Sequence, residues 1–184
     1  KGQQAKAHGA LQHAMRRVSF TLGEGLLSLA VDENRRLSDL DAFPLSQDAA
    51  LQRQEIDDLL RRSELLEAPR FLLLERDAVL SKELKLPLAA EPDLAQVLAF
   101  EMDRQTPFRA GSVYFDWKIA DRSATPGQLK LHLFVVPRGE VDRAVTALEN
   151  RGLALAGVDV RDHDRTLGLN LLPADQRVRT VNPR

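Results

Sequence analysis

Apolar and polar residues alternate in several short runs of this chain, and that spacing predicts strands with one buried face. Residues 18–22 alternate in this way, and after a short break residues 26–31 form an almost continuous apolar run. Asp32-Glu33-Asn34 is predicted as a turn, from which residues 35–45 return as a second strand. We therefore expect strands joined by a turn before the first helix.

Three segments instead carry apolar residues at helical spacing. The first spans residues 47–66 and has Ser46 as its expected N-cap. The second opens at Glu91-Pro92-Asp93, where proline and acidic residues suit a first turn, and the third runs from about residue 140 to 151 with Gly152 as its stop. The second helix is expected to bury a stripe made of Leu94, Val97, Leu98 and Met102.

Strand-like runs separate these helices. The predicted strands are residues 71–74 and 78–86, an antiparallel hairpin of residues 113–119 and 129–135, and a closing pair at residues 158–160 and 167–172. The element order is therefore two strands and a helix, three times over, with two strands at the end. Such alternation favours an α/β fold with mixed sheets in two lobes. Lobe boundaries are expected near Pro87 and near residues 152–157.

The composition excludes several classes of protein. The 184-residue chain has 43% apolar residues, a net charge of −1 and no cysteine. It can therefore bury a core, but it cannot form disulfides or thiolate zinc sites. No apolar run approaches the roughly 20 residues of a membrane span, and the near-neutral charge gives no footprint for nucleic acid. Residues 1–14 are expected to be a disordered tail or a tag.

Few residues suggest catalysis or metal binding. His163 lies between Asp162 and Asp164, but adjacent side chains rarely point at one ion, so a solvated turn is the better interpretation. Gly23-Glu24-Gly25 precedes an apparent strand rather than a helix, which favours a turn over a phosphate loop. Asp57-Asp58 is expected on a solvated helix face. We therefore expect no catalytic, cofactor-binding or metal-binding residue, and no enzyme.

The polar helix end at residues 100–106 is the most informative stretch. Pro107 ends that helix, and Phe108 is expected to pack it onto the sheet beside Phe115 and Trp117, with a partner-facing Phe108 as the alternative. The charged residues around this helix end suit a polar, reversible protein interface. The candidate partner-binding residues are Glu101, Asp103, Arg104, Thr106, Phe108 and Arg109.

Several motifs in order resemble a known family. Residues 101–108, the strand with Phe115-Asp116, residues 131–153 and Gly157-Val158-Asp159-Val160 resemble the pilus-assembly scaffold PilM. They also resemble the cytoplasmic domain of the inner-membrane L component of type II secretion, the GspL family. The likeness covers roughly residues 70–160. In addition, residues 169–173 (Leu-Asn-Leu-Leu-Pro) resemble the entrance to PilN-like membrane proteins.

This resemblance implies a truncated actin-like (RNase H-like) fold with an inserted small α/β subdomain. It implies a first lobe at residues 15–86, the inserted subdomain at 87–153, return strands at 154–174 and a juxtamembrane linker at 175–184. It also implies a transmembrane span after Arg184, which would anchor the protein with this part on the cytoplasmic face of the bacterial inner membrane. The arginines of residues 175–184 fit that orientation, because positive charges beside a span favour the inner side.

By the same resemblance, the protein is a non-catalytic scaffold that binds the N-terminal domain of the secretion ATPase, the E component. The other implied partners are the M and F platform proteins and a second copy of the full-length protein; nucleic acid is not expected. A type IV pilus scaffold, a divergent actin-like ATPase and a membrane adaptor outside secretion remain open. Against the ATPase, Val31-Asp32-Glu33-Asn34 lacks the glycine of an Asp-x-Gly phosphate loop.

Overall fold

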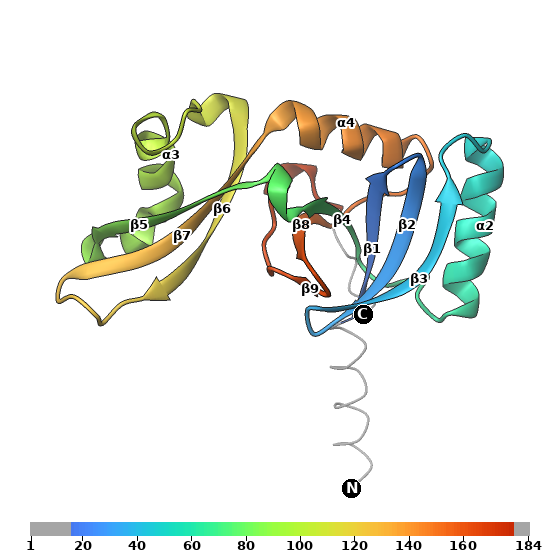
Figure 1. Ribbon diagram of the computed structural model, residues 1–184, viewed down its shortest axis with the longest axis horizontal. Helices are drawn as coiled ribbons and strands as arrows, with labels where there is room; N and C mark the ends of the chain where they lie inside the picture. The colour runs from blue at the N-terminus through green and yellow to red at the C-terminus, as the bar shows by residue number, and fades with distance from the viewer. Residues whose placement is uncertain (1–15, 179–184) are drawn as a thin grey trace, which may run out of the picture.

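The computed structural model describes residues 16–178, and their strands form two sheets (Figure 1). The first sheet is a closed barrel in the order β1-β2-β3-β9-β8-β4. Its strands are β1 (Arg16–Gly23), β2 (Leu26–Glu33), β3 (Arg36–Pro44), β4 (Arg70–Glu75), β8 (Gly157–Asp162) and β9 (Arg165–Thr166). β1, β2 and β3 are antiparallel neighbours, whereas β4 runs parallel to both β1 and β8. The predicted mixture of strand directions is present.

The chain opens with three strands rather than the two expected from its pattern. Gly23-Glu24-Gly25 forms the turn between β1 and β2, with positive φ at Glu24 (52°) and Gly25 (74°). Asp32 was expected in a turn, but it lies within β2 and is 1% exposed. The turn comes two residues later, at Asn34 and Arg35, where φ is again positive. A buried carboxylate that far into a strand requires partners, which the barrel supplies as described below.

Three α-helices lie where the apolar spacing predicted them: α2 (Ala49–Arg62), α3 (Leu94–Gln105) and α4 (Arg138–Glu149). The N-cap of α2 is Asp48 rather than Ser46, because the Asp48 carboxylate accepts hydrogen bonds from the N–H groups of Ala50 and Leu51. A 3-10 helix over Leu88–Asp93 precedes α3. Gly152 has φ +73° and ends the segment after α4, as expected.

The second sheet has the order β5-β7-β6 and consists of β5 (Leu80–Pro87), β6 (Val113–Asp121) and β7 (Gln128–Pro137). β6 and β7 are the predicted antiparallel hairpin. α3 covers one face of this sheet, and α4 runs from the end of β7 across to the barrel (Figure 1). The expected lobe boundary at residues 86 and 87 falls within β5. This strand pairs with β7, so the second sheet begins earlier, at Leu80.

Residues 167–172 do not form the predicted closing strand, although two backbone hydrogen bonds connect this segment to β8. Leu167 and Leu171 donate their N–H groups to the carbonyls of Val160 and Val158. Between them, side chains take the backbone donors: the Leu169 N–H donates to Asp159 (2.9 Å) and the Asn170 N–H to Asp116 (2.8 Å). Because side chains replace the ladder here, the regular closing strand β9 is limited to Arg165–Thr166.

Two large apolar cores hold the sheets, and a third, small cluster consists of Ala30, Leu37 and Leu73. The barrel core includes Phe20, Leu27, Ile56 and Val158, and the second core packs Leu98 and Met102 of α3 against leucines of β7. Of the predicted α3 stripe, Leu94, Leu98 and Met102 are buried while Val97 is half-buried. Tyr114, Phe134 and Val136 at the ends of β6 and β7 belong to the barrel core. The two lobes are therefore joined through shared apolar packing.

Tyr114 joins the second sheet to α4 and makes stability depend on pH. Tyr114 is buried as a whole, and its hydroxyl donates to the Asp142 carboxylate at 2.6 Å. Burial, followed by that hydrogen bond, raises the pKa of Tyr114. The fold thus favours the neutral phenol, so its contribution is complete below a pH of about 10 and is lost as pH rises through the raised pKa.

We therefore expect wild type to lose more stability than Tyr114→Phe as the pH rises from about 8 to about 11. The measurement is the urea denaturation midpoint of each protein across this pH range. Subtracting one protein from the other cancels the titration of the lysines, which both proteins contain. An unchanged difference between the two proteins would contradict the assignment.

Candidate functional site

The candidate partner-binding residues lie at the C-terminal end of α3 and in the loop after it. Thr106 is buried and closes the helix: its Oγ1 donates to the Met102 carbonyl at 2.7 Å and accepts the Phe108 N–H at 3.1 Å. Its backbone N–H also donates to the Met102 carbonyl. The structure therefore places Thr106 as a residue that shapes the helix end, with its hydroxyl directed inward.

The charged candidates Glu101, Asp103 and Arg104 lie in the last turns of α3. Glu101 and Arg104 form an ion pair of 3.5 Å across one helical turn, and the Glu101 side chain is only 22% exposed. Asp103 is exposed on another side of the helix, because residues two apart do not face each other. An exposed pair at this spacing adds only about 0.2–0.5 kcal/mol to the helix. Arg104, whose side chain is 64% exposed, and Asp103 are thus available for contacts with another molecule at little cost to the fold.

Phe100 is the residue at this surface that sequence reasoning did not select. Its side chain is 68% exposed, and the Arg104 guanidinium lies 5.2 Å from the centre of its ring. Because Phe100 falls between Leu98 and Met102 of the buried stripe, helical spacing alone could have placed it on the outer face. A large exposed aromatic ring beside an arginine combines the residue types enriched at the centres of protein interfaces.

Phe108 packs rather than projecting freely. It is half-buried against the second core, whose edge also includes Phe115 and Trp117, as the packing hypothesis expected. Together with Pro107 it also lines an open groove between the start of β5 and the start of α4. Arg109 is exposed, and its carbonyl accepts the backbone N–H and the hydroxyl of Ser112. The six candidates therefore divide into an outer group on α3 and a capping loop.

A buried polar network joins four strands of the barrel, β1, β2, β8 and β9. Arg17 donates to Asp32 at 2.6 Å and to Asp159 at 3.1 Å, and both carboxylates are fully buried. Thr166 donates its hydroxyl to Asp32 at 3.1 Å. The Arg17 guanidinium also lies 4.1 Å from the centre of the Phe71 ring. Both carboxylates accept hydrogen bonds from groups of the protein itself, so neither is free to bind an ion.

The remaining chemical candidates lie in ordinary surroundings. His163 is fully in solvent at a positive φ of 57° in the turn between β8 and β9, 3.8 Å from Asp162. Asp58 pairs with Arg61 on the exposed side of α2. Within residues 16–178, no group of three or more His, Cys, Asp or Glu side chains could hold a metal ion. In that same part of the chain, no helix has the length and apolar character needed to span a membrane.

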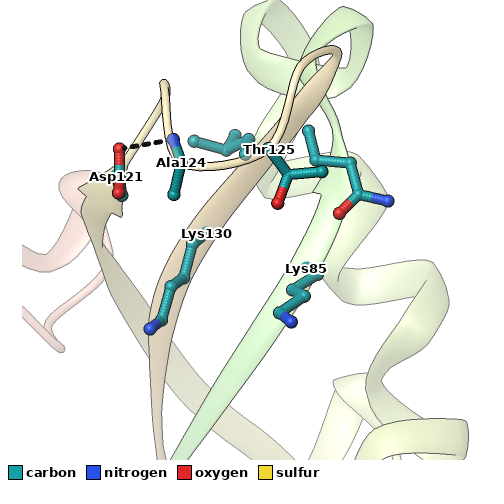
Figure 2. Close-up of a pocket in the computed structure, with 7 residues that line it drawn as sticks. Lys85, Asp121, Ala124, Thr125 and Lys130 are labelled. Carbon is teal, nitrogen blue, oxygen red and sulfur yellow. Dashed lines mark hydrogen bonds between the residues drawn. The ribbon is translucent and has the colours of Figure 1, made fainter.

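A small pocket of about 110 Å³ lies at the far end of the second sheet (Figure 2). Lys85 and Lys130 project in the same direction from β5 and β7, and the Asp121 carboxylate accepts the N–H groups of Ser123 (2.7 Å) and Ala124 (3.2 Å). The Ser123 N–H is the main cause of a lowered pKa at Asp121. Since this carboxylate closes its own loop, the pocket is a feature of the β6–β7 turn rather than a ligand site.

No family model matches this chain. The chain is, however, similar to type II secretion system protein L of Xanthomonas campestris pv. campestris, with 42% identity over 134 residues. The match covers 72% of this chain but 35% of that protein, so the chain spans about a third of its relative. This homology confirms the resemblance to the L components that the sequence motifs suggested.

The likeness extends to solved structures. A PilM-PilN type IV pilus biogenesis complex matches with a TM-score of 0.56 and 18% identity, over 80% of this chain and 48% of that chain. The cytoplasmic domain of EpsL of Vibrio cholerae matches with a TM-score of 0.49 and 12% identity, over 79% of this chain and 56% of that chain. The predicted α/β class with a mixed sheet is confirmed, and the match to the PilM-PilN complex shows a shared fold.

Proposed function

We propose that this chain, a homologue of type II secretion system protein L, is a non-catalytic scaffold domain on the cytoplasmic side of an inner-membrane secretion platform. In this proposal it recruits the secretion ATPase, the E component, to that platform, beside the M and F components and a second copy of the full-length protein. The homology supports the secretion assignment. The feature that supports a docking role is the outer face of α3, where Phe100 stands in solvent among Glu101, Asp103 and Arg104.

The physical case for this face is its combination of one apolar anchor with flanking charge. Truncating an exposed aromatic residue costs a folded monomer little, but loss of a central aromatic anchor costs a complex about 2 kcal/mol or more. The charges around it would steer the encounter, because rim charges act mainly on the association rate and its dependence on salt. Thr106 and Phe108 are proposed to support the face by holding the end of α3 in place.

Phe100→Ala is therefore expected to weaken binding of the ATPase N-terminal domain by about 30-fold or more, which corresponds to about 2 kcal/mol. The measurement is co-purification of the ATPase with the full-length L-type protein from membranes, followed by titration calorimetry with this chain. The melting temperature should change little because the ring lies mainly in solvent.

The matched control is Leu51→Ala, which truncates a side chain that is 58% exposed on α2 of the other lobe. It should bind the ATPase as wild type does. Equal binding by Phe100→Ala and Leu51→Ala would remove α3 as the docking face. The absence of any complex with wild type would overturn the recruitment role itself. Capture of a pilus ATPase instead would favour the PilM–PilN-like pilus scaffold as the alternative.

The competing hypothesis of an actin-like ATPase makes the opposite prediction about nucleotide. Gly23-Glu24-Gly25 joins two strands, and the Asp32 carboxylate is occupied by Arg17 and Thr166. We therefore expect no heat of binding when magnesium and ATP are titrated into the chain, and no phosphate release. Micromolar ATP binding that disappears in Asp32→Asn would establish the ATPase hypothesis in place of the scaffold.

A further inference from the structure

β5 is an uncovered edge of the second sheet. It pairs with β7 alone, over eight residues and without a bulge. The other edge strand, β6, is crossed by the C-terminal segment, where Asp116 accepts the Asn170 N–H and Lys118 donates to the Leu167 carbonyl. Within residues 16–178, no hydrogen bond reaches the backbone of β5 from any strand except β7. Such an edge is a template for another strand.

The alternation of the strand shows which backbone groups face outward. The Leu88 N–H, directly after β5, donates to the Gly127 carbonyl at 2.9 Å, on the β7 side. Backbone groups alternate in direction along a strand, so those of Leu84 and Leu86 also point toward β7. The N–H and C=O groups of Ser81, Glu83 and Lys85 consequently point away from the sheet.

The sequence of β5 is complementary to itself in one antiparallel register, centred on Leu84. In that register Glu83 of one copy lies opposite Lys85 of the other, and the outward backbone groups of these two residues form the hydrogen-bonded pair. The Ser81 N–H faces the Pro87 carbonyl. Pro87 has no N–H, and this register places it in the last residue pair of the two strands, where a missing hydrogen bond disrupts the pairing least.

The same register also matches the apolar residues. Leu80 and Leu88 are among the exposed large apolar residues of the described chain, at 38% and 39%. Each lies four residues from Leu84, so the register places Leu80 of one copy opposite Leu88 of the other. Leu80 lies on the same face of β5 as Leu84, which contacts the second core, and Leu88 is the first residue of the 3-10 helix after the strand.

The charge of Lys85 favours the same register. It lies directly opposite Lys130 of β7, and like charges opposite each other destabilise a sheet. Lys130 has a partner in Glu83 at 3.2 Å, whereas no ion pair of Lys85 is found within residues 16–178. A second β5 in this register supplies the missing carboxylate from its own Glu83.

We propose that two copies of this chain join edge to edge through β5, antiparallel and centred on Leu84, so that two three-stranded sheets become one. The inference deepens the proposed scaffold role, from which the second copy comes, and it leaves the outer face of α3 open for the ATPase. Because paired edge strands alone bury little surface, the contact is weak in solution and is strengthened when both copies are held on one membrane.

The register can be tested by disulfide formation, since the chain contains no cysteine of its own. Glu83→Cys and Lys85→Cys are prepared separately, mixed at high concentration and oxidised. Opposed residues of an antiparallel pair have Cα atoms about 5.5 Å apart, within the range for a disulfide. A linked dimer carrying one of each variant is expected from the mixture, with little from either variant alone.

The matched control is a mixture of Ser81→Cys and Lys85→Cys. In the proposed register Ser81 lies opposite Pro87, two residues away from Lys85, so these two cysteines are too far apart for a disulfide. Equal linking in both mixtures, stronger linking of Glu83→Cys with itself, or no linking at all would each overturn the proposal. None of these results involves the ATPase, so a failure here and a failure of ATPase docking are separate outcomes.

A charge exchange gives an independent readout. Lys85→Glu places a carboxylate opposite each Glu83 and should abolish the dimer in sedimentation equilibrium. Adding Glu83→Lys restores opposite charges across the two-fold axis and keeps a carboxylate beside Lys130. The double variant should therefore dimerise again, with the salt sensitivity of an ion pair. Dimerisation of Lys85→Glu at the wild-type level would contradict the register.

Discussion

Asp159→Ala is expected to lower the free energy of unfolding by about 3–5 kcal/mol, as removal of one partner from a buried ion pair does. The Asp159 carboxylate is fully buried and accepts the Arg17 guanidinium at 3.1 Å. It also accepts the backbone N–H groups of Gly168 (3.2 Å) and Leu169 (2.9 Å). Alanine would leave these donors without an acceptor inside the barrel, which adds the cost of buried unpaired polar groups.

Urea denaturation measures this change, and Asp164→Ala is the matched control. Asp164 lies in the exposed turn between β8 and β9, and a surface substitution of that kind is usually within about 0.5 kcal/mol of wild type. Asp159→Asn keeps the shape and one acceptor oxygen, so it should fall between the two. If Asp159→Ala were as stable as Asp164→Ala, the network would not be holding residues 166–170 to the barrel.

Leu98→Ala is expected to cost about 3–5 kcal/mol because the side chain is fully buried between α3 and the second sheet. Its cluster is separate from the barrel core. The loss should therefore concentrate in α3, β5, β6 and β7. Hydrogen exchange followed by mass spectrometry would show reduced protection in these elements, with smaller changes in β1 and β2.

Gln96→Ala serves as the control, since Gln96 is exposed on the same helix and alanine is a good helix former. It should leave the exchange pattern unchanged. Equal loss of protection in the barrel and in the second sheet of Leu98→Ala would mean that the two cores unfold as one unit. That result would contradict the division into two clusters.

Helices and the central hairpin could be predicted because their patterns are local. The stripe Leu94, Leu98, Met102 repeats at every fourth residue, and Leu129, Leu131, Leu133 and Val135 alternate without interruption. The outward position of Phe100 could be predicted from the same spacing. Its exposure follows from being out of phase with the buried stripe.

The C-terminal segment shows where local patterns fail. Residues 167–172 alternate like a strand, yet Asp159 and Asp116 accept the N–H groups of Leu169 and Asn170. These carboxylates come from β8 and β6, and no pattern within the segment itself reveals them. Asp32 is similar: its neighbours Glu33 and Asn34 suggested a turn, but Arg17 and Thr166 satisfy its charge inside the barrel.

The sequence by itself determined the alternation of helices and strands, the residues of each apolar face, and the homology to an L component of type II secretion. These depend on spacing and residue identity along the chain. Tertiary structure alone decided that β4 and β1 close a barrel with β8 and β9, that β5 is left as a free edge, and that Gly157 lies against Phe71 and Asn170. Such features arise between residues distant in sequence, because pairing and close approach depend on which surfaces the chain brings together.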